Sequence, residues 1–180
     1  MANDHVSRGE VATGERFEAF FHTHDTAIFG YLWRMTGNRE VASDLTQETF
    51  VRAWQRFSTI STYDAPRSWL FRVATHLALN YARHSRTRAT VDSWAAVEPA
   101  YDNPAHADHA DQIVDRDAIC MILLSLPPRE RAALILHSVY GYSFAEVAQA
   151  LSISLSAARV ALWRGREHFR ARYLREEGQP

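Results

Sequence analysis

Apolar residues recur at intervals of three and four along most of the chain, which is the period of a helix that buries one face. The first such stretch runs from Glu15 to about Thr36 and stops before Gly37, a residue suited to the left-handed turn that ends a helix. Residues 1–14 are polar and predict a disordered leader. The inward positions of this first helix are Phe17, Phe20, Phe21, His24, Ile28, Tyr31, Leu32 and Met35.

Two further helices are predicted in the first half of the chain. Asn38 can cap the second helix with its side chain. The Ser- and Thr-rich stretch from Phe57 to Asp64 predicts a loop, and Pro66 stands where the first residue of a third helix, ending near Arg86, is expected. Residues 15–88 therefore predict a three-helix, all-α domain.

The helical period lapses over residues 89–110, where two prolines and isolated acids predict a flexible, acidic linker. Fully extended, such a stretch reaches roughly 70 Å, about two turns of B-DNA at ~34 Å each. A second helical domain is predicted over residues 111–175, with a short tail at 176–180. The predicted fold is therefore all-α, with two small helical domains that could occupy separate sites on one duplex.

The second domain contains a pattern typical of a helix-turn-helix. Ser143 and Glu146 have the spacing of a capping box just before an apolar run. The sequence Ser152-Ile153-Ser154 interrupts that helix, and Ser154 can cap the next one. A helix with a small, polar, Arg-bearing start then follows, and in a helix-turn-helix this second helix enters the major groove. The alternative is an ordinary helical hairpin with a solvated Arg face, but the agreement of cap, turn and charge favours DNA binding.

Charge is distributed unevenly although the formal net charge is only −1. Residues 65–91 contain five arginines and no acid, and residues 89–115 contain six acids and no base. From residue 155 to 175 there are six arginines and one acid, Glu167. The net charge thus hides two basic regions of the kind that bind nucleic acid.

Several other classes of protein are disfavoured. The single cysteine, Cys120, allows no internal disulfide, the N-terminus lacks a signal-peptide core, and the longest apolar run is too short to span a bilayer. We therefore expect a cytoplasmic protein without membrane insertion. No phosphate-binding loop, nucleophile elbow or zinc-protease motif is present, so an enzyme is not expected, and neither is a cofactor. The His- and Asp-containing stretches at 22–25 and 106–111 lack Cys partners and do not predict a metal site.

Four stretches resemble bacterial sigma factors, and they occur in the order found in that family. Residues 44–54 are similar to the polymerase-binding segment of the extracytoplasmic-function (ECF) group of the sigma-70 family. Residues 67–80 resemble its promoter-melting and minus-ten helix, residues 126–131 the beginning of its second domain, and the helix-turn-helix its minus-thirty-five reader. The resemblance implies an RNA polymerase sigma factor that directs core polymerase to promoters and assists promoter melting.

Candidate polymerase-binding residues follow from the first of these stretches. Asp44, Gln47 and Glu48 lie at i, i+3 and i+4 and so share one helix face. An acidic, hydrogen-bonding face suits a basic partner helix, which the resemblance implies to be the β′ clamp helices of core RNA polymerase. The β flap as a second polymerase contact, promoter DNA and an anti-sigma factor are the other partners that the resemblance implies.

Candidate DNA contacts are expected in both domains. Capture of unstacked bases uses aromatic platforms and a basic groove, and the resemblance suggests that the loop at 57–64 holds a flipped base. Packing in the core is an equally weighted alternative for Trp69. The residues assigned to minus-ten recognition and melting are Phe57, Tyr63, Arg67, Trp69, Arg72, Asn80, Arg83 and Arg86.

In the second domain Ser156 and Arg159 are the best candidates for base edges, whereas the other arginines are expected to position the protein on phosphates. Two residues depart from the family pattern: Ala161 replaces a common basic residue, and Ser152 replaces a frequent Gly at the turn. The full minus-thirty-five set is Arg129, Ser154, Ser156, Ala157, Arg159, Arg164 and Arg166.

The main alternative function is a stand-alone helix-turn-helix transcriptional regulator that acts without docking on core polymerase. Such a regulator needs only the second domain, so it leaves the acidic face of residues 44–48 and the aromatic and basic third helix unexplained. A stand-alone regulator should bind duplex DNA tightly by itself, whereas a sigma factor should bind it weakly without polymerase.

Overall fold

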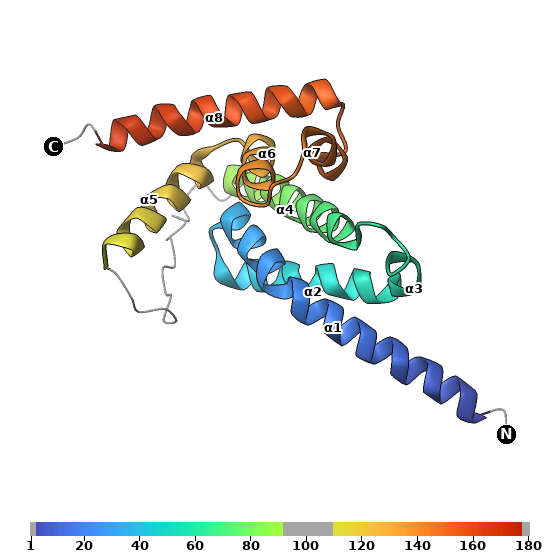
Figure 1. The fold of residues 1–180 in the computed structure, drawn as a ribbon. Coiled ribbons are helices and arrows are strands. Elements are labelled where there is room, and N and C mark those ends of the chain that lie inside the picture. The colour runs from blue at the N-terminus through green and yellow to red at the C-terminus, as the bar shows by residue number, and fades with distance from the viewer. Residues whose placement is uncertain (1–2, 92–109, 178–180) are drawn as a thin grey trace.

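The computed structural model describes residues 3–91 and 110–177, with side chains described over 13–85 and 118–175. Within these residues the structure is built from helices without strands, which confirms the predicted all-α fold. Figure 1 shows a first group of helices followed by a second group packed on it. Residues 92–109 of the predicted linker and the last residues of the predicted tail lie outside the described residues, whereas residues 89–91 and 110 belong to the flanking helices. The helices are α1 (Asn3–Thr36), α2 (Arg39–Gln55), α3 (Phe57–Ile60), α4 (Pro66–Val91), α5 (Ala110–Ser125), α6 (Pro128–Ser138), α7 (Phe144–Leu151) and α8 (Leu155–Glu177).

The first domain, α1 to α4, begins with a long hairpin of α1 and α2. Gly37 adopts φ 68° at the turn, and the Asn38 side chain accepts a hydrogen bond from the Val41 backbone N–H at 3.0 Å. α1 begins at Asn3, so the segment expected to be a disordered leader is mostly helix. Adding turns to an existing helix costs little compared with starting one, and no proline interrupts this segment. The predicted loop at 57–64 likewise begins with one helical turn, α3.

The second domain, α5 to α8, contains the predicted helix-turn-helix in α7 and α8. The Ser143 hydroxyl accepts from the Glu146 backbone N–H at 3.3 Å, and the Glu146 carboxylate accepts from the Ser143 backbone N–H at 2.8 Å, so the capping box is confirmed. Ser152 ends α7 in the left-handed conformation, with φ 52° and ψ 49°. Because a residue with a Cβ is strained by about 1–2 kcal/mol there, Ser152 makes the turn that Gly would make more easily.

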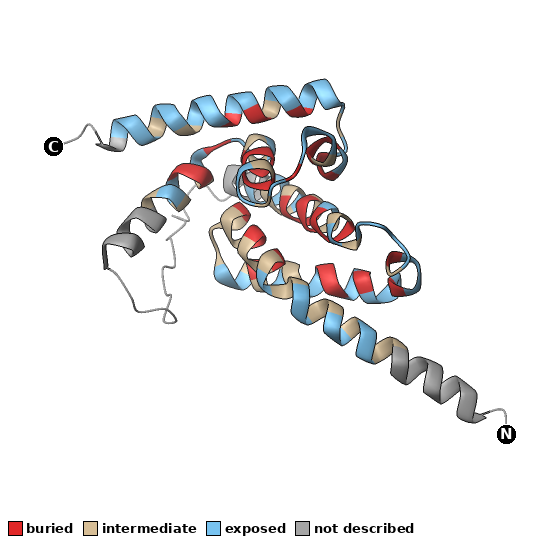
Figure 2. Cartoon of the chain, viewed as in Figure 1, coloured by how far each residue is buried: buried red, intermediate tan, exposed pale blue. Residues whose placement is uncertain are grey.

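The two domains share one hydrophobic core. Figure 2 shows buried residues on the facing sides of α1, α2, α4, α6 and α7, whereas much of α8 is exposed. The Tyr140 hydroxyl donates to the Ala27 backbone carbonyl at 2.9 Å, and the Ser152 hydroxyl lies 3.0 Å from His76 Nε2. The sequence predicted two domains that could occupy separate sites on one duplex, and the close packing of the domains is a difference from that expectation.

A buried arginine occupies the junction of the domains. The Arg131 side chain is 8% exposed and donates to the backbone carbonyls of Met35, Leu124 and Leu126. These carbonyls lie at or just beyond the C-terminal ends of α1 and α5, where helix carbonyls lack intrahelical donors and carry partial negative charge. One guanidinium thus joins an end of the first domain to an end of the second.

Aromatic rings fill the space beside this junction. Phe71 of α4 lies 4.6 Å from the Tyr140 ring and 5.3 Å from the Tyr142 ring, measured between centroids. Tyr31 of α1 is fully buried, shares a hydrogen bond of 2.7 Å with the Thr75 hydroxyl, and has its pKa raised by burial. The segment between α6 and α7 is therefore held against the first domain by ring packing as well as by hydrogen bonds.

Candidate functional site

The acidic triplet lies on the outer surface of α2. Asp44, Gln47 and Glu48 are all exposed, as their shared face predicted. Glu48 accepts a hydrogen bond from Arg52 Nε at 2.8 Å. Because both side chains of this ion pair are about half exposed, the pair contributes little to stability. The carboxylate of Glu48 is therefore held in place on the surface while remaining available to a larger basic partner.

The same face of α2 becomes apolar toward its C-terminal end. Gln47, Val51 and Trp54 follow at i, i+4 and i+7, so they lie in one row along the helix. Val51 is 50% and Trp54 49% exposed, and the Trp54 ring packs edge-on against Phe17 of α1 at 4.9 Å. This acidic and apolar row, which we call the α2 face, combines charge with exposed apolar area.

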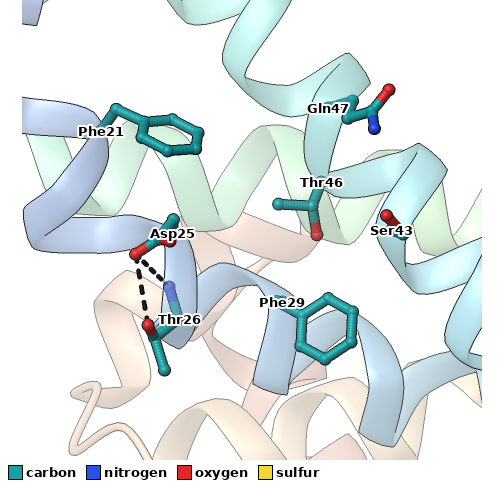
Figure 3. A pocket seen from close by; sticks show the side chains of 7 residues that line it. All are labelled: Phe21, Asp25, Thr26, Phe29, Ser43, Thr46 and Gln47. Atoms are coloured by element: carbon teal, nitrogen blue, oxygen red, sulfur yellow. Dashed lines mark hydrogen bonds between the residues drawn. The ribbon is translucent and has the colours of Figure 1, made fainter. Parts of the chain in front are cut away.

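A pocket of about 350 Å³ lies between α1 and α2, beside Gln47 (Figure 3). The carboxylate of Asp25 on its α1 side accepts from the Thr26 backbone N–H at 2.6 Å and from the Thr26 hydroxyl at 3.2 Å. The pocket opens next to the α2 face, and so the surface around the triplet is hollowed rather than flat. Its lining residues are Phe21, Asp25, Thr26, Phe29, Ser43, Thr46 and Gln47.

The aromatic residues assigned to the minus-ten element differ in exposure: Phe57 is buried, Trp69 takes the core position that was its open alternative, and Tyr63 is exposed. Phe57 is 6% exposed and packs against Phe17 and Phe20 at centroid distances of 5.1 and 5.5 Å, and Trp69 is 8% exposed. A ring that stacks on a base must present a free face, so these two rings act as core residues. Tyr63, which is 45% exposed in the turn before α4, keeps the accessibility that a stacking platform needs.

The polar residues assigned to α4 fall into two groups. Arg72, Asn80 and Arg83 are exposed on the outer side of the helix, where Arg83 donates to the Asn80 side-chain oxygen at 3.2 Å. Arg67 is also exposed but lies at the seam between the domains, with its guanidinium 5.3 Å from the Phe71 ring centroid and 5.6 Å from that of Tyr142. Arg86 belongs to α4, but its side chain is outside the described region.

The second helix of the helix-turn-helix, α8, is positioned by close packing on α6. Gly165 is buried against this helix: a Cβ there would lie 2.9 Å from the Glu130 backbone oxygen. His168 Nδ1 lies 2.7 Å from a carboxylate oxygen of the same Glu130. The missing side chain allows the two helices to approach, and the polar pair fixes α8 against rotation, so its opposite side faces outward.

Every residue assigned to the minus-thirty-five element is exposed. Ser154 accepts from the Ala157 backbone N–H at 3.2 Å, as expected of a cap, and its hydroxyl lies 3.0 Å from that of Ser156. The Arg159 guanidinium lies 5.7 Å from the centroid of the Phe144 ring, which restricts its orientation. Two exposed apolar residues on the same helix, Val160 and Trp163, were not among the predicted contacts. Their spacing from Ser156 was the signal that could have revealed them.

Comparison with known proteins identifies the family. Residues 12–88 match the family model of sigma-70 region 2, and residues 116–169 match that of sigma-70 region 4. The chain is 30% identical over 172 residues to the ECF RNA polymerase sigma factor SigL of Mycobacterium tuberculosis, an alignment that covers 94% of this chain and 93% of SigL. The chain belongs to the sigma-70 family. The resemblance to the ECF group is thereby confirmed, and the presence of region 2 disfavours the stand-alone regulator.

Other comparisons agree with this assignment. The sigma factor is 30% identical over 168 residues to the ECF RNA polymerase sigma factor SigE of Mycolicibacterium smegmatis. This alignment covers 90% of this chain but only 63% of SigE. Among solved structures, the sigma factor RpoE in its complex with the anti-sigma factor NepR from Bartonella quintana matches with a TM-score of 0.73 and 18% identity. That match covers 88% of this chain and 97% of RpoE, so the shared fold includes both domains.

Two further observations concern the described residues as a whole. None of the helices in these ranges has the length and apolar content needed to cross a membrane. Over the same ranges, no three His, Cys, Asp or Glu side chains come together in a way that could hold a metal ion.

Proposed function

We propose that this ECF sigma factor docks on the β′ clamp helices of core RNA polymerase through Asp44, Gln47 and Glu48. These side chains are exposed together on the α2 face, and their charge suits a basic helix. The apolar continuation at Val51 and Trp54 supplies area that a partner can bury. The observation that carries the proposal is the presence of regions 2 and 4 in one chain, each with an exposed charged surface.

In the same complex, the first domain engages the minus-ten element and the second domain reads the minus-thirty-five element. Tyr63 supplies the stacking platform, and the outer side of α4 supplies cations and hydrogen-bonding groups through Arg72, Asn80 and Arg83. On α8, Arg159 and Ser156 contact base edges, while the remaining arginines contact phosphates and set the position of the helix. Because each domain neutralises few phosphates, binding to DNA without polymerase is weak.

The remaining partners follow from the same role. The β flap of polymerase is the proposed contact of the second domain, and an anti-sigma factor is the proposed regulator, since RpoE of the same fold is bound by NepR. An anti-sigma factor that covers the α2 face would prevent docking by direct competition. The role is exercised in the cytoplasm and requires no catalytic group or cofactor in this chain.

The proposal is tested by binding of purified sigma factor to core bacterial RNA polymerase. Asp44→Arg/Glu48→Arg should weaken binding by at least about 100-fold, because two attractive contacts become repulsive. The matched control is Glu18→Arg/Glu167→Arg, which makes the same change in net charge at exposed positions off the α2 face. Circular dichroism checks that both variants fold. Equal binding by wild type and the Asp44/Glu48 variant would refute the docking assignment, and tight duplex binding without any polymerase binding would favour the stand-alone regulator.

A further inference from the structure

Three large apolar side chains are exposed in the first turns of the recognition helix: Leu155, at 44%, and Val160 and Trp163, which share one side of it. Val160 is 47% exposed and Trp163 63% exposed, so a large part of both apolar side chains is in contact with water. Exposed apolar groups that lie together are characteristic of binding surfaces. Their position on a helix already assigned to DNA raises the question of what they contact there.

The geometry of α8 places both side chains on the side that faces away from the protein. Ala158 and Leu162 are buried at 0% and 1% exposure and fix the inward side of the helix. At 100° per residue, Ser156, Val160 and Trp163 follow at i, i+4 and i+7 and form a single row on the opposite side. In a helix-turn-helix this outward side of the second helix is the one that enters the major groove.

The surroundings of the row indicate its ligand. Arg159 lies on one side of the row and Arg164 on the other, both exposed, so the apolar groups lie between two cations. Cations contact the phosphates or guanine edges, and the groups between them meet base edges. Of the groups that base pairs present in the major groove, the thymine 5-methyl is the apolar one.

We infer that Val160 and Trp163 are specificity-determining residues that recognise thymine methyl groups in the minus-thirty-five element. This inference rests on the proposed reading of that element by α8. It adds an apolar contribution to a recognition helix whose previously assigned contacts are polar or small, and it predicts that T·A pairs are selected opposite this row. The same apolar row could instead be covered by a protein partner, and the experiment distinguishes the two.

The test uses the holoenzyme, formed from core polymerase and the full-length sigma factor. Selection from duplex DNA randomised in the minus-thirty-five region should enrich at least one T·A pair. Each selected thymine is then replaced singly by deoxyuridine, which lacks only the 5-methyl group. At one or two positions this replacement should weaken wild-type binding about 3- to 5-fold, as expected for one buried methyl group. Holoenzyme with Val160→Ala or Trp163→Ala should bind the thymine and uridine duplexes equally at the corresponding position.

Tyr173→Ala and Leu174→Ala are the matched controls, because both remove exposed apolar side chains from α8 far from its N-terminal end. They should keep the wild-type ratio between thymine and uridine duplexes. Sequence-specific binding with no enriched thymine, or with equal affinity for every uridine duplex, would overturn the inference but leave the reading of the element intact. The inference would also be overturned if the Val160→Ala and Trp163→Ala variants kept the wild-type ratio between thymine and uridine duplexes and lost only binding to core polymerase. The row would then contact protein rather than DNA. Absence of any sequence selection in this region would overturn the proposed function as well.

Discussion

Arg131 offers the sharpest test of how the two domains are held together. In Arg131→Met the side chain keeps a similar length but loses every donor, so the carbonyls of Met35, Leu124 and Leu126 lose the donor that joins them. A hydrogen bond to a charged group is worth about 1.5 kcal/mol or more, which gives about 4–5 kcal/mol for three. Burying a thioether in place of a guanidinium returns about 1 kcal/mol. We therefore expect a loss of about 3–4 kcal/mol in the free energy of unfolding.

Urea denaturation followed by circular dichroism and tryptophan fluorescence measures this loss. With an m-value of about 2 kcal/mol/M, the midpoint should fall by about 1.5–2 M. Arg129→Met is the matched control: it removes the same group from the exposed side of the same helix, and its effect should stay within about 0.5 kcal/mol. An Arg131→Met protein within about 1 kcal/mol of wild type would refute the reasoning, because the buried donors would then contribute no more than surface ones.

Two further predictions concern the same junction. Gly37→Ala should destabilise the protein by about 3 kcal/mol, since φ is 68° and the new Cβ would clash with a Leu124 methyl. The control Gly141→Ala, with φ 73° and nothing within 4 Å of the new Cβ, should cost only about 1 kcal/mol. Equal losses of stability in thermal denaturation would contradict the close approach of Leu124 to Gly37. Burial, and secondarily the charge of Arg67, lowers the pKa of His24 below 6.5. The folded protein therefore favours neutral His24, so the stability associated with this residue is present above pH 6.5 and is lost as the pH falls through the lowered pKa. An NMR titration should give a midpoint below 6.5 that rises only partly in Arg67→Met, and an unchanged midpoint in that variant would remove Arg67 as a cause.

Local signals in the sequence predicted most of the helices and the turn of the helix-turn-helix, but not the N-terminal part of α1 or the short helix α3. The capping box at Ser143 and Glu146 and the cap at Asn38 depend on residues within three positions of one another, so their spacing alone indicates the structure. The exposure of Asp44 and of Arg159 followed from helical periodicity in the same way. These features require no knowledge of what packs against them.

Features that depend on distant segments were not predictable from such spacing. Arg129 and Arg131 stand two residues apart on one helix, and only the positions of the α1 and α5 carbonyls make the second of them a buried residue. Phe57 follows α2 in a polar stretch that resembles a loop, but Phe17 and Phe20 of α1 complete a pocket for its ring. Trp163 shows the reverse case, because a large aromatic residue is expected inside and the structure leaves it outside.

Because the domains share a core, their separation is an equilibrium step with its own free-energy cost. A junction stabilised by about 4 kcal/mol leaves about one molecule in a thousand with its domains apart. Any partner that requires the separated arrangement then binds with an apparent dissociation constant larger by that factor, whatever its own contacts contribute. Substitutions at Tyr140 or Arg131 would therefore change the apparent affinity for such a partner although neither residue touches it. A ligand that recognises only the joined arrangement would weaken the binding of such a partner without covering the α2 face or α8.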